Sequence, residues 1–124
     1  MTGVVFDASA LIALLKREPG WESVERALTA GGFCGAANLA EVAQKVRFFG
    51  FQWETVWSFL RSYGLTVVPI LEADALRAAL LWKPRENFSL ADRLCLALAD
   101  RLELPALTAD TAWKGKHPRA QLIR

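Results

Sequence analysis

The sequence predicts an α/β protein, a three-layer α/β/α sandwich built on a mostly parallel sheet of four or five strands. Short apolar segments rich in β-branched residues alternate with longer segments whose apolar residues recur at helical spacing. That order is typical of parallel strands joined by crossover helices. No repeat or linker interrupts the pattern, and 124 residues suffice for one ordinary core, so we expect a single domain over residues 1–124.

Five segments have the character of strands. Residues 3–6 (GVVF) are short, apolar and partly β-branched, as expected of a buried strand. Residues 33–36 (FCGA), 66–70 (TVVPI) and 105–110 (PALTAD) are the next three, and each is bounded by residues that favour turns or helix starts. Residues 120–123 (AQLI) are a candidate for a last, short edge strand.

Six segments have the periodicity of helices, with leucine, valine or aromatic residues on one face. Pro19-Gly20 ends the first, Gly31-Gly32 ends the second, and Pro84 stops the fifth. The last has the strongest pattern of the six. The expected helices cover residues 10–16, 20–32, 38–50, 52–64, 72–83 and 89–103.

Composition narrows the function classes. Hydrophobic residues make up 53% of the chain, which excludes a disordered protein, and a net charge of +2 indicates neither a nucleic-acid nor a membrane partner by itself. No apolar run approaches the roughly 18 residues that span a bilayer, and no basic residue precedes Lys16 as a secretory signal requires. Cys34 and Cys95 lack metal-ligand spacing, although a disulfide between them stays open. We therefore expect a reduced, cytoplasmic protein.

Four acidic residues stand where a strand gives way to the next helix or where a helix opens: Asp7, Glu41, Asp92 and Asp110. Each has a structural explanation, because acids suit helix N-termini. The NLAE and SLAD segments, which contain Glu41 and Asp92, also have the spacing of capping boxes opened by Asn38 and Ser89.

Considered together, the four acids indicate chemistry. The carboxyl ends of parallel strands meet at one edge of the sheet, so these side chains should project toward the same place. Carboxylates gathered there repel one another unless a cation lies among them. Oxygen ligands suit Mg²⁺ or Mn²⁺, and such an ion can activate water and stabilise an in-line displacement at phosphorus.

Four motifs occur in order along nearly the whole chain: FDASALIALL, NLAEV, SLADRLCLALA and LTADTAW. Their order, character and separation resemble those of the PIN-domain family, specifically the small VapC-like toxins of prokaryotic toxin–antitoxin pairs. The resemblance implies a PIN-like fold and a metal-dependent endoribonuclease that cleaves RNA, uses Mg²⁺ or Mn²⁺, and is inhibited by a cognate antitoxin.

The resemblance also implies roles for particular residues. It makes Ser9 and Thr108 polar companions that orient carboxylates or water, and it gives Glu41 either metal binding or help in positioning the attacking water. Asn38 stands where many relatives have serine or threonine, which caps a helix equally well. The implied catalytic and metal-binding set is Asp7, Glu41, Asp92 and Asp110.

Several basic residues are candidates for contact with substrate: Arg93, Lys114 and Lys116. Arg93 could hold an anionic substrate, and a surface ion pair is an equal alternative. Residues 114–124 contain no acid, so this segment is either a solvated tail or a contact for RNA phosphates. His117, the only histidine, lies in KGKHPR, where we expect a surface loop and no catalytic role.

Residues 48–59 are unusually aromatic, with Phe48, Phe49, Phe51, Trp53, Trp57 and Phe59. One helix hairpin does not usually hide so many aromatic rings, so part of this segment is a candidate partner surface and the rest is core. The resemblance implies two partners, a second copy of the chain in a homodimer and the antitoxin.

Three other functions stay open. A catalytically inactive PIN-like module could bind RNA or serve as a scaffold, and a nuclease of the same fold could act on DNA. A receiver-like domain also binds Mg²⁺ through clustered acids, but it needs two adjacent acids after the first strand and a lysine after a late strand. Asp7 has no acidic neighbour and no lysine directly follows PALTAD, so the receiver class fits poorly.

Overall fold

The sheet at the centre of the protein is entirely parallel. The computed structural model describes residues 2–124 and places five strands of that region in one sheet, in the order β3-β2-β1-β4-β5. The strands are β1 (Val4–Phe6), β2 (Gly32–Gly35), β3 (Thr66–Val68), β4 (Ala106–Thr108) and β5 (Ala120–Leu122). The predicted edge strand near the C-terminus is therefore confirmed. Because β1 is central, the residue that follows it leaves the middle of the carboxyl edge.

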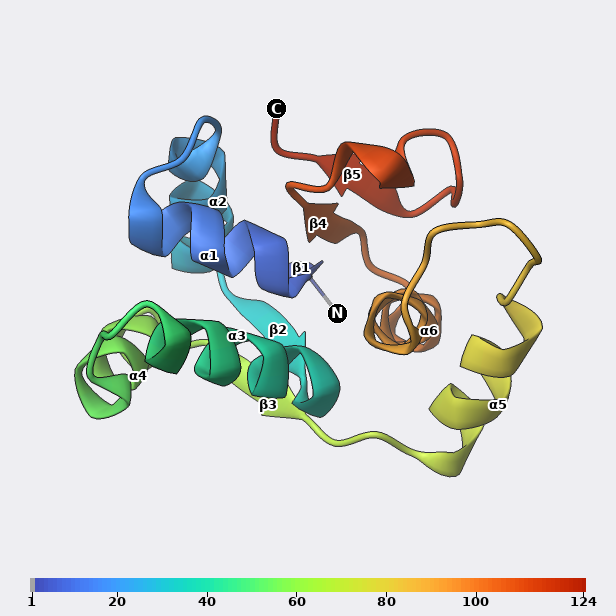
Figure 1. Ribbon diagram of the computed structural model, residues 1–124, viewed down its shortest axis with the longest axis horizontal. Helices are drawn as coiled ribbons and strands as arrows, with labels where there is room; N and C mark the ends of the chain where they lie inside the picture. The colour runs from blue at the N-terminus through green and yellow to red at the C-terminus, as the bar shows by residue number, and fades with distance from the viewer. Residues whose placement is uncertain (1) are drawn as a thin grey trace.

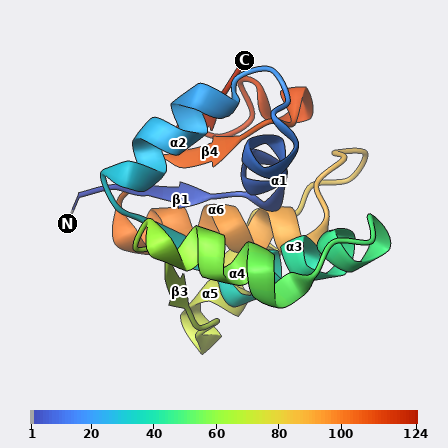
Figure 2. The same ribbon diagram turned by 90° about the vertical axis from the view of Figure 1, so that its left-hand side faces the viewer.

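Helices cover both faces of the sheet, which confirms the predicted three-layer α/β/α sandwich. Figure 1 shows α1 to α4 on one side of the strands and α5 with α6 on the other, and Figure 2 views the first group face-on. Within residues 2–124 the helices are α1 (Ala8–Lys16), α2 (Trp21–Thr29), α3 (Ala36–Phe48), α4 (Trp53–Ser62), α5 (Glu72–Leu80), α6 (Leu90–Leu102) and the 3₁₀-helix η1 (Thr111–Trp113).

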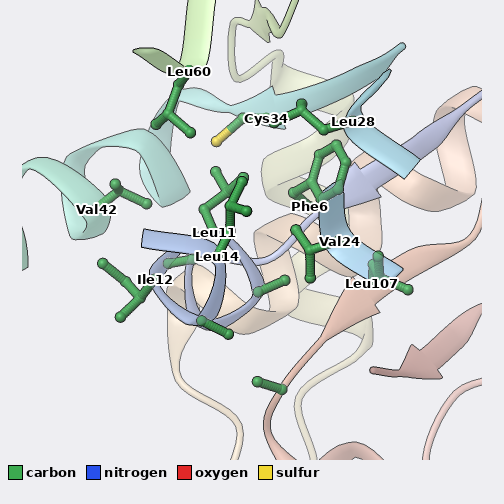
Figure 3. Close-up of a cluster of buried hydrophobic side chains, with 14 of the residues drawn as sticks. Phe6, Leu11, Ile12, Leu14, Val24, Leu28, Cys34, Val42, Leu60 and Leu107 are labelled. Carbon is green, nitrogen blue, oxygen red and sulfur yellow. The ribbon is translucent and has the colours of Figure 1, made fainter. Parts of the chain in front are cut away.

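The buried apolar side chains form two clusters, one on each face of the sheet. Val5 and Phe6 belong to different clusters, because successive residues of a strand point to opposite faces. A side chain at Gly32 in β2 would overlap the ring of Phe6, so glycine is what lets this ring lie across the neighbouring strand. The cluster under α1 to α4 includes Phe6, Leu11, Val24, Leu28 and Leu60 (Figure 3). The cluster under α6 includes Val5, Leu96, Leu104, Ala106 and Trp113.

All the predicted strands and helices are present, but several ends differ. Helix α1 begins two residues earlier than expected, and α2 ends at Thr29 because the chain already enters β2 at Gly32. Helix α5 ends at Leu80, three residues before the predicted Lys83; Pro84 disfavours helical backbone at Lys83 only, so it does not account for the earlier end. The short helix η1, directly after Asp110, was not predicted.

The aromatic segment is divided between core and surface. Trp53 and Trp57 stack with ring centroids 5.4 Å apart and pack against the cluster under α1 to α4. The other four rings of the segment are exposed, namely Phe48, Phe49, Phe51 and Phe59.

No helix in the described part of the chain is long and apolar enough to cross a membrane.

Candidate functional site

The carboxyl edge of the sheet is where the segments that carry the four acids meet. Asp7 directly follows β1, Glu41 lies on the helix that follows β2, and Asp110 lies just beyond β4. Helix α6 leads into β4, so its first turn, which contains Asp92, lies near the edge at which the strands end. The N-termini of α1, α3 and α6 are at this edge, and their dipoles favour negative charge there.

Asp7 is buried and held by two hydroxyl groups. Its side chain is almost inaccessible to solvent, with the whole residue 3% exposed. Ser9 Oγ and Thr108 Oγ1 donate hydrogen bonds of 2.6 and 2.9 Å to Asp7 Oδ2. Burial raises the pKa of Asp7, and the two hydroxyl bonds partly oppose that rise. Asp7 occupies the N-cap position of α1 without a side-chain capping bond to that helix, although the backbone N–H groups of Ala8 and Ser9 also act to lower its pKa.

The same two hydroxyls connect α1 to the chain after β4. Ser9 Oγ accepts a hydrogen bond of 2.9 Å from the amide of Ala109, and Thr108 Oγ1 accepts one of 3.0 Å from the amide of Asp110. Thr108 is fully buried. These bonds fix the path of the backbone that carries Asp110 relative to Asp7, which is the kind of contact expected of Ser9 and Thr108 as companions of the acids.

The predicted capping box in NLAE is wrong, and the reason lies in where α3 begins. The helix starts at Ala36 with Gly35 as its N-cap, so Asn38 is already the third helical residue. The Asn38 side chain is buried, and its Nδ2 donates to Glu41 Oε1 at 3.1 Å and to the carbonyl of Ala91 in α6 at 3.3 Å. Asn38 therefore holds Glu41 and also joins α3 to the turn that carries the next acid.

The capping box in SLAD is confirmed. The amide of Asp92 donates to Ser89 Oγ at 3.1 Å, and Asp92 Oδ2 accepts from the amide of Ser89 at 3.0 Å. Asp110 also caps, because its Oδ1 accepts a 2.9 Å bond from the amide of Ala112 at the start of η1. Asp92 and Asp110 thus have a structural role that Asp7 and Glu41 lack.

The acids affect one another through their charges. Burial raises the pKa of Glu41, and the charges of Asp7 and Asp92 raise it further, against the hydrogen bond from Asn38. Burial also raises the pKa of Asp92, with added contributions from Asp7 and Asp110. Each acid therefore lies within electrostatic reach of at least one other, as expected for carboxylates that share one edge.

The acids nevertheless do not form a tight cage. In residues 2–124, no three Asp, Glu, His or Cys side chains come close enough together to hold one metal ion among them. A cation such as Mg²⁺ is usually held by one or two carboxylates, with water and substrate phosphate completing its shell. The available donors here are carboxylate oxygens, so their chemistry fits a divalent cation that keeps much of its water.

The predicted substrate contacts have different surroundings. The guanidinium of Arg93 is directed to α5, where its Nη1 donates to the carbonyl of Ala78 at 2.9 Å. Lys114 and Lys116 are exposed just after η1, near Asp110 in the sequence. All three remain candidates for substrate contact.

The expected surface loop around His117 is present, but the imidazole itself is buried. Its Nε2 lies 3.2 Å from the carboxylate of Asp100, while its Nδ1 accepts a bond from the amide of Arg119. This network packs the imidazole against α6, leaving the residue 9% exposed. Residues 114–124 are therefore not a loose tail.

Asn38 is the residue at this site that the sequence reasoning misassigned. Its spacing to Glu41 matches a capping box, and nothing in the sequence indicates that the helix has already begun.

The two cysteines, whose pairing the sequence left open, are both free and buried.

Comparison with known proteins identifies the family. The sequence profile of the PIN domain matches residues 4–116, a span that contains all four acids. The chain belongs to the PIN-domain family. PIN domains are typically nucleases and generally use divalent metal ions, which agrees with the oxygen donors at the sheet edge. A search among curated proteins gives no match to the chain.

Two solved structures resemble this PIN domain along its length. One is a toxin–antitoxin complex from Klebsiella pneumoniae, with a TM-score of 0.75 and 21% identity, in which 98% of each chain is covered. The other is PAE2754 from Pyrobaculum aerophilum, with a TM-score of 0.66 and 18% identity, covering 98% of this chain and 84% of that one. At these identities the likeness shows a common fold.

Proposed function

We propose that this PIN-domain protein is a metal-dependent endoribonuclease toxin. The observation that carries the proposal is the Asp7 carboxylate, which is buried, is held by the hydroxyls of Ser9 and Thr108, and lies within electrostatic reach of Glu41 and Asp92. A buried carboxylate costs free energy unless it is paired. A divalent cation beside Asp7 would offset both this cost and the repulsion among the acids.

Each acid has a role in the proposed reaction. Asp7, Asp92 and Asp110 would hold Mg²⁺ or Mn²⁺ directly or through water. The bound ion would supply charge stabilisation at the phosphodiester under attack. Glu41 either joins these ligands or orients the attacking water and takes its proton, a role that the raised pKa of this carboxyl supports. Ser9 and Thr108 keep Asp7 in place through their hydroxyl bonds.

The remaining parts of the proposal concern the environment of the enzyme. Residues 1–124 would form a single nuclease domain in the cytoplasm, with Lys114, Lys116 and Arg93 available to RNA phosphates. A homodimer and a cognate antitoxin would be its protein partners. The Klebsiella pneumoniae structure, a toxin–antitoxin complex, supports the antitoxin, and the exposed rings of Phe51 and Phe59 offer an apolar contact surface.

The experiment measures cleavage of RNA and of single-stranded DNA by the purified protein, first in EDTA and then after addition of Mg²⁺ or Mn²⁺. We expect no cleavage in EDTA, restoration by either ion, and a clear preference for RNA. Undiminished cleavage in EDTA would contradict the metal mechanism. A preference for DNA would instead favour a DNA-directed nuclease, and cleavage of neither substrate would favour an inactive scaffold.

A further inference from the structure

A cleft of about 430 Å³ opens beside the candidate site, between α1, α3 and the C-terminal end of the chain. Ser9 and Asp110 line the cleft where it adjoins the acids. Ser9, Ile12 and Lys16 form a stripe along one face of α1, because residues three and four positions apart lie on the same side of a helix. The stripe extends about 10 Å, from the acidic end of the cleft to a lysine.

Helix α3 supplies the facing wall. It packs beside α1, and both helices begin at the carboxyl edge of the sheet (Figure 1). Lys45 follows Glu41 by one helical turn, and Phe48 and Phe49 follow by a second turn, so acid, cation and aromatic rings succeed one another along this helix. Both helices therefore lead from the acids to positive charge.

The far end of the cleft has more cations than acids. Glu18 lies 3.9 Å from Lys16 and 3.9 Å from Arg124, so two cations share one carboxylate. Lys45 forms no ion pair within the described residues. The ammonium of Lys16 also lies 4.2 Å from the ring centroid of Phe49, which joins the charge to an aromatic surface.

We infer that this cleft binds a single-stranded segment of the RNA next to the bond to be cleaved. Lys45 and Lys16 contact its phosphates, and the exposed ring of Phe48, which packs edge-to-face against Phe49, stacks on an unpaired base. The inference rests on the proposed function and deepens it, because it assigns residues that hold the substrate to a site so far described by its acids.

The exposure of the aromatic rings and the positive charge of the cleft favour single-stranded RNA as the occupant. Phe48 is 84% exposed and Phe49 39%, and a base can stack on such rings only when it is not already stacked within a duplex. Lys45 and the two cations around Glu18 attract an anionic polymer and repel a basic protein segment. Carboxylates alone at the edge would repel RNA, so cations beside them are what binding requires.

The test measures binding of a short, labelled oligouridylate to the full chain by fluorescence anisotropy in EDTA, where the proposed cleavage cannot proceed. The cleft variants are Lys45→Ala and Phe48→Ala. Their matched controls are Lys83→Ala and Trp82→Ala, which remove the same kinds of exposed side chain from the turn after α5. Melting curves establish that all four variants are folded.

We expect Phe48→Ala to weaken binding roughly five- to hundredfold, the range for losing one aromatic stacking partner. Lys45→Ala should reduce the slope of log affinity against log salt by about 0.7, the value for one phosphate contact on a single strand. The two controls should bind like the wild type, and a blunt duplex should bind more weakly than the single strand.

Two results overturn the inference: no measurable binding by the wild type, or wild-type affinity in both cleft variants. If those variants keep RNA affinity but lose binding to the protein encoded beside this chain, the cleft is a protein-docking surface and the inference is wrong. RNA cleavage by the two cleft variants is also measured with Mn²⁺. We expect these variants to have a raised KM and a nearly unchanged kcat. Wild-type binding without any cleavage would contradict the proposed function and leave the cleft inference standing.

Discussion

Asp7 is held in a setting that opposes its charge. Water is excluded from it, which disfavours the ionised form, and its only side-chain partners are the hydroxyls of Ser9 and Thr108. These hydroxyls and the nearby backbone N–H groups of Ala8 and Ser9 compensate only part of the cost of burying the carboxylate, because the pKa of Asp7 is still raised. The same two hydroxyls fix its position, so the proposed binding of a cation would not require this carboxylate to move.

Asn38 is the residue whose removal should most directly disturb Glu41. Asn38→Ala deletes the donor to Glu41 and leaves the partly buried carbonyl of Ala91 without its bond to this side chain. We expect a loss of about 1–3 kcal/mol in the free energy of unfolding, the usual cost of losing a buried partner, and slower RNA cleavage through a lower kcat. Denaturant unfolding and steady-state kinetics measure the two effects.

Asn87→Ala is the matched control, because Asn87 is exposed in the loop before α6. Its stability should stay within about 0.5 kcal/mol of the wild type. If Asn38→Ala behaved like this control in both measurements, the bonds of Asn38 would have no role in holding Glu41.

At the residue level, the sequence distinguishes chemistry from capping only in part. SLAD and NLAE have the same spacing of cap and acid, yet Ser89 caps α6 while Asn38 lies inside α3. Two alanines after Gly35 extend α3 back toward β2. Alanine favours helix, but it does not mark the residue at which a helix begins. Which acids cap depends on where each helix begins, and that depends on packing.

At the level of elements, α5 and α6 are joined by a bidentate ion pair. Arg101 donates to both oxygens of Asp74, at 2.8 and 3.0 Å, and the amide of Leu71 donates to Asp74 Oδ2 at 3.0 Å. Burial acts to raise the pKa of Asp74, but these hydrogen bonds outweigh it and hold the pKa below its usual range. The fold therefore favours the ionised form of this carboxylate.

This pair should make stability depend on pH in a defined direction. The pKa of Asp74 is lower in the folded chain than in the unfolded chain, where it is about 3.9. Its contribution is therefore present above that pH and is lost as the pH falls through the lowered pKa. We expect Asp74→Asn to cost about 2 kcal/mol at pH 7, and the difference from wild type to shrink in acid.

The measurement is urea unfolding of both proteins from pH 7 down to pH 3. Glu72→Gln, a carboxylate-to-amide change at an exposed position of the same helix, should have little effect at any pH. A difference between wild type and Asp74→Asn that grew as the pH fell would mean that the ionised pair does not stabilise the contact between α5 and α6.

The order and type of the elements could be predicted because each strand is a compact apolar segment and each helix has a clear periodicity. Helix and strand ends were harder: α5 stops short of Pro84 by several residues, and η1 is too short to have a periodic pattern. Backbone bonds from Trp113 to Asp110 and from Lys114 to Thr111 form η1, and the Asp110 side chain caps it; so few bonds leave no signature in residue spacing.

At the level of the whole molecule, the exposed aromatic side chains predict association. Besides Phe48 and Phe49 at the cleft, Phe51 and Phe59 have exposed rings that a monomer leaves in water. We expect light scattering at micromolar concentration to give twice the mass of one chain, and a tighter complex to form with the antitoxin. A clean monomer would count against the dimer, and failure to bind the protein encoded next door would count against the antitoxin.

The candidate site was predictable as a set of acids at one sheet edge, because a parallel topology places the ends of β1, β2 and β4 together. Its surroundings were not. The hydroxyl bonds to Asp7 and the link from Asn38 to α6 join residues far apart in the sequence. The cleft beside the acids arises from two helices and the C-terminal end, which only the folded chain brings together.

The most direct measurement compares thermal unfolding of wild type and Asp7→Asn with and without Mn²⁺, alongside their rates of RNA cleavage. Asparagine removes one charge from a self-repelling group, so the metal-free variant should keep or gain stability. Its stabilisation by Mn²⁺ should shrink because metal affinity falls, and cleavage should slow by at least about a hundredfold. A variant with the wild-type Mn²⁺ shift and wild-type cleavage would contradict the account and leave Asp7 as a structural residue at the end of β1.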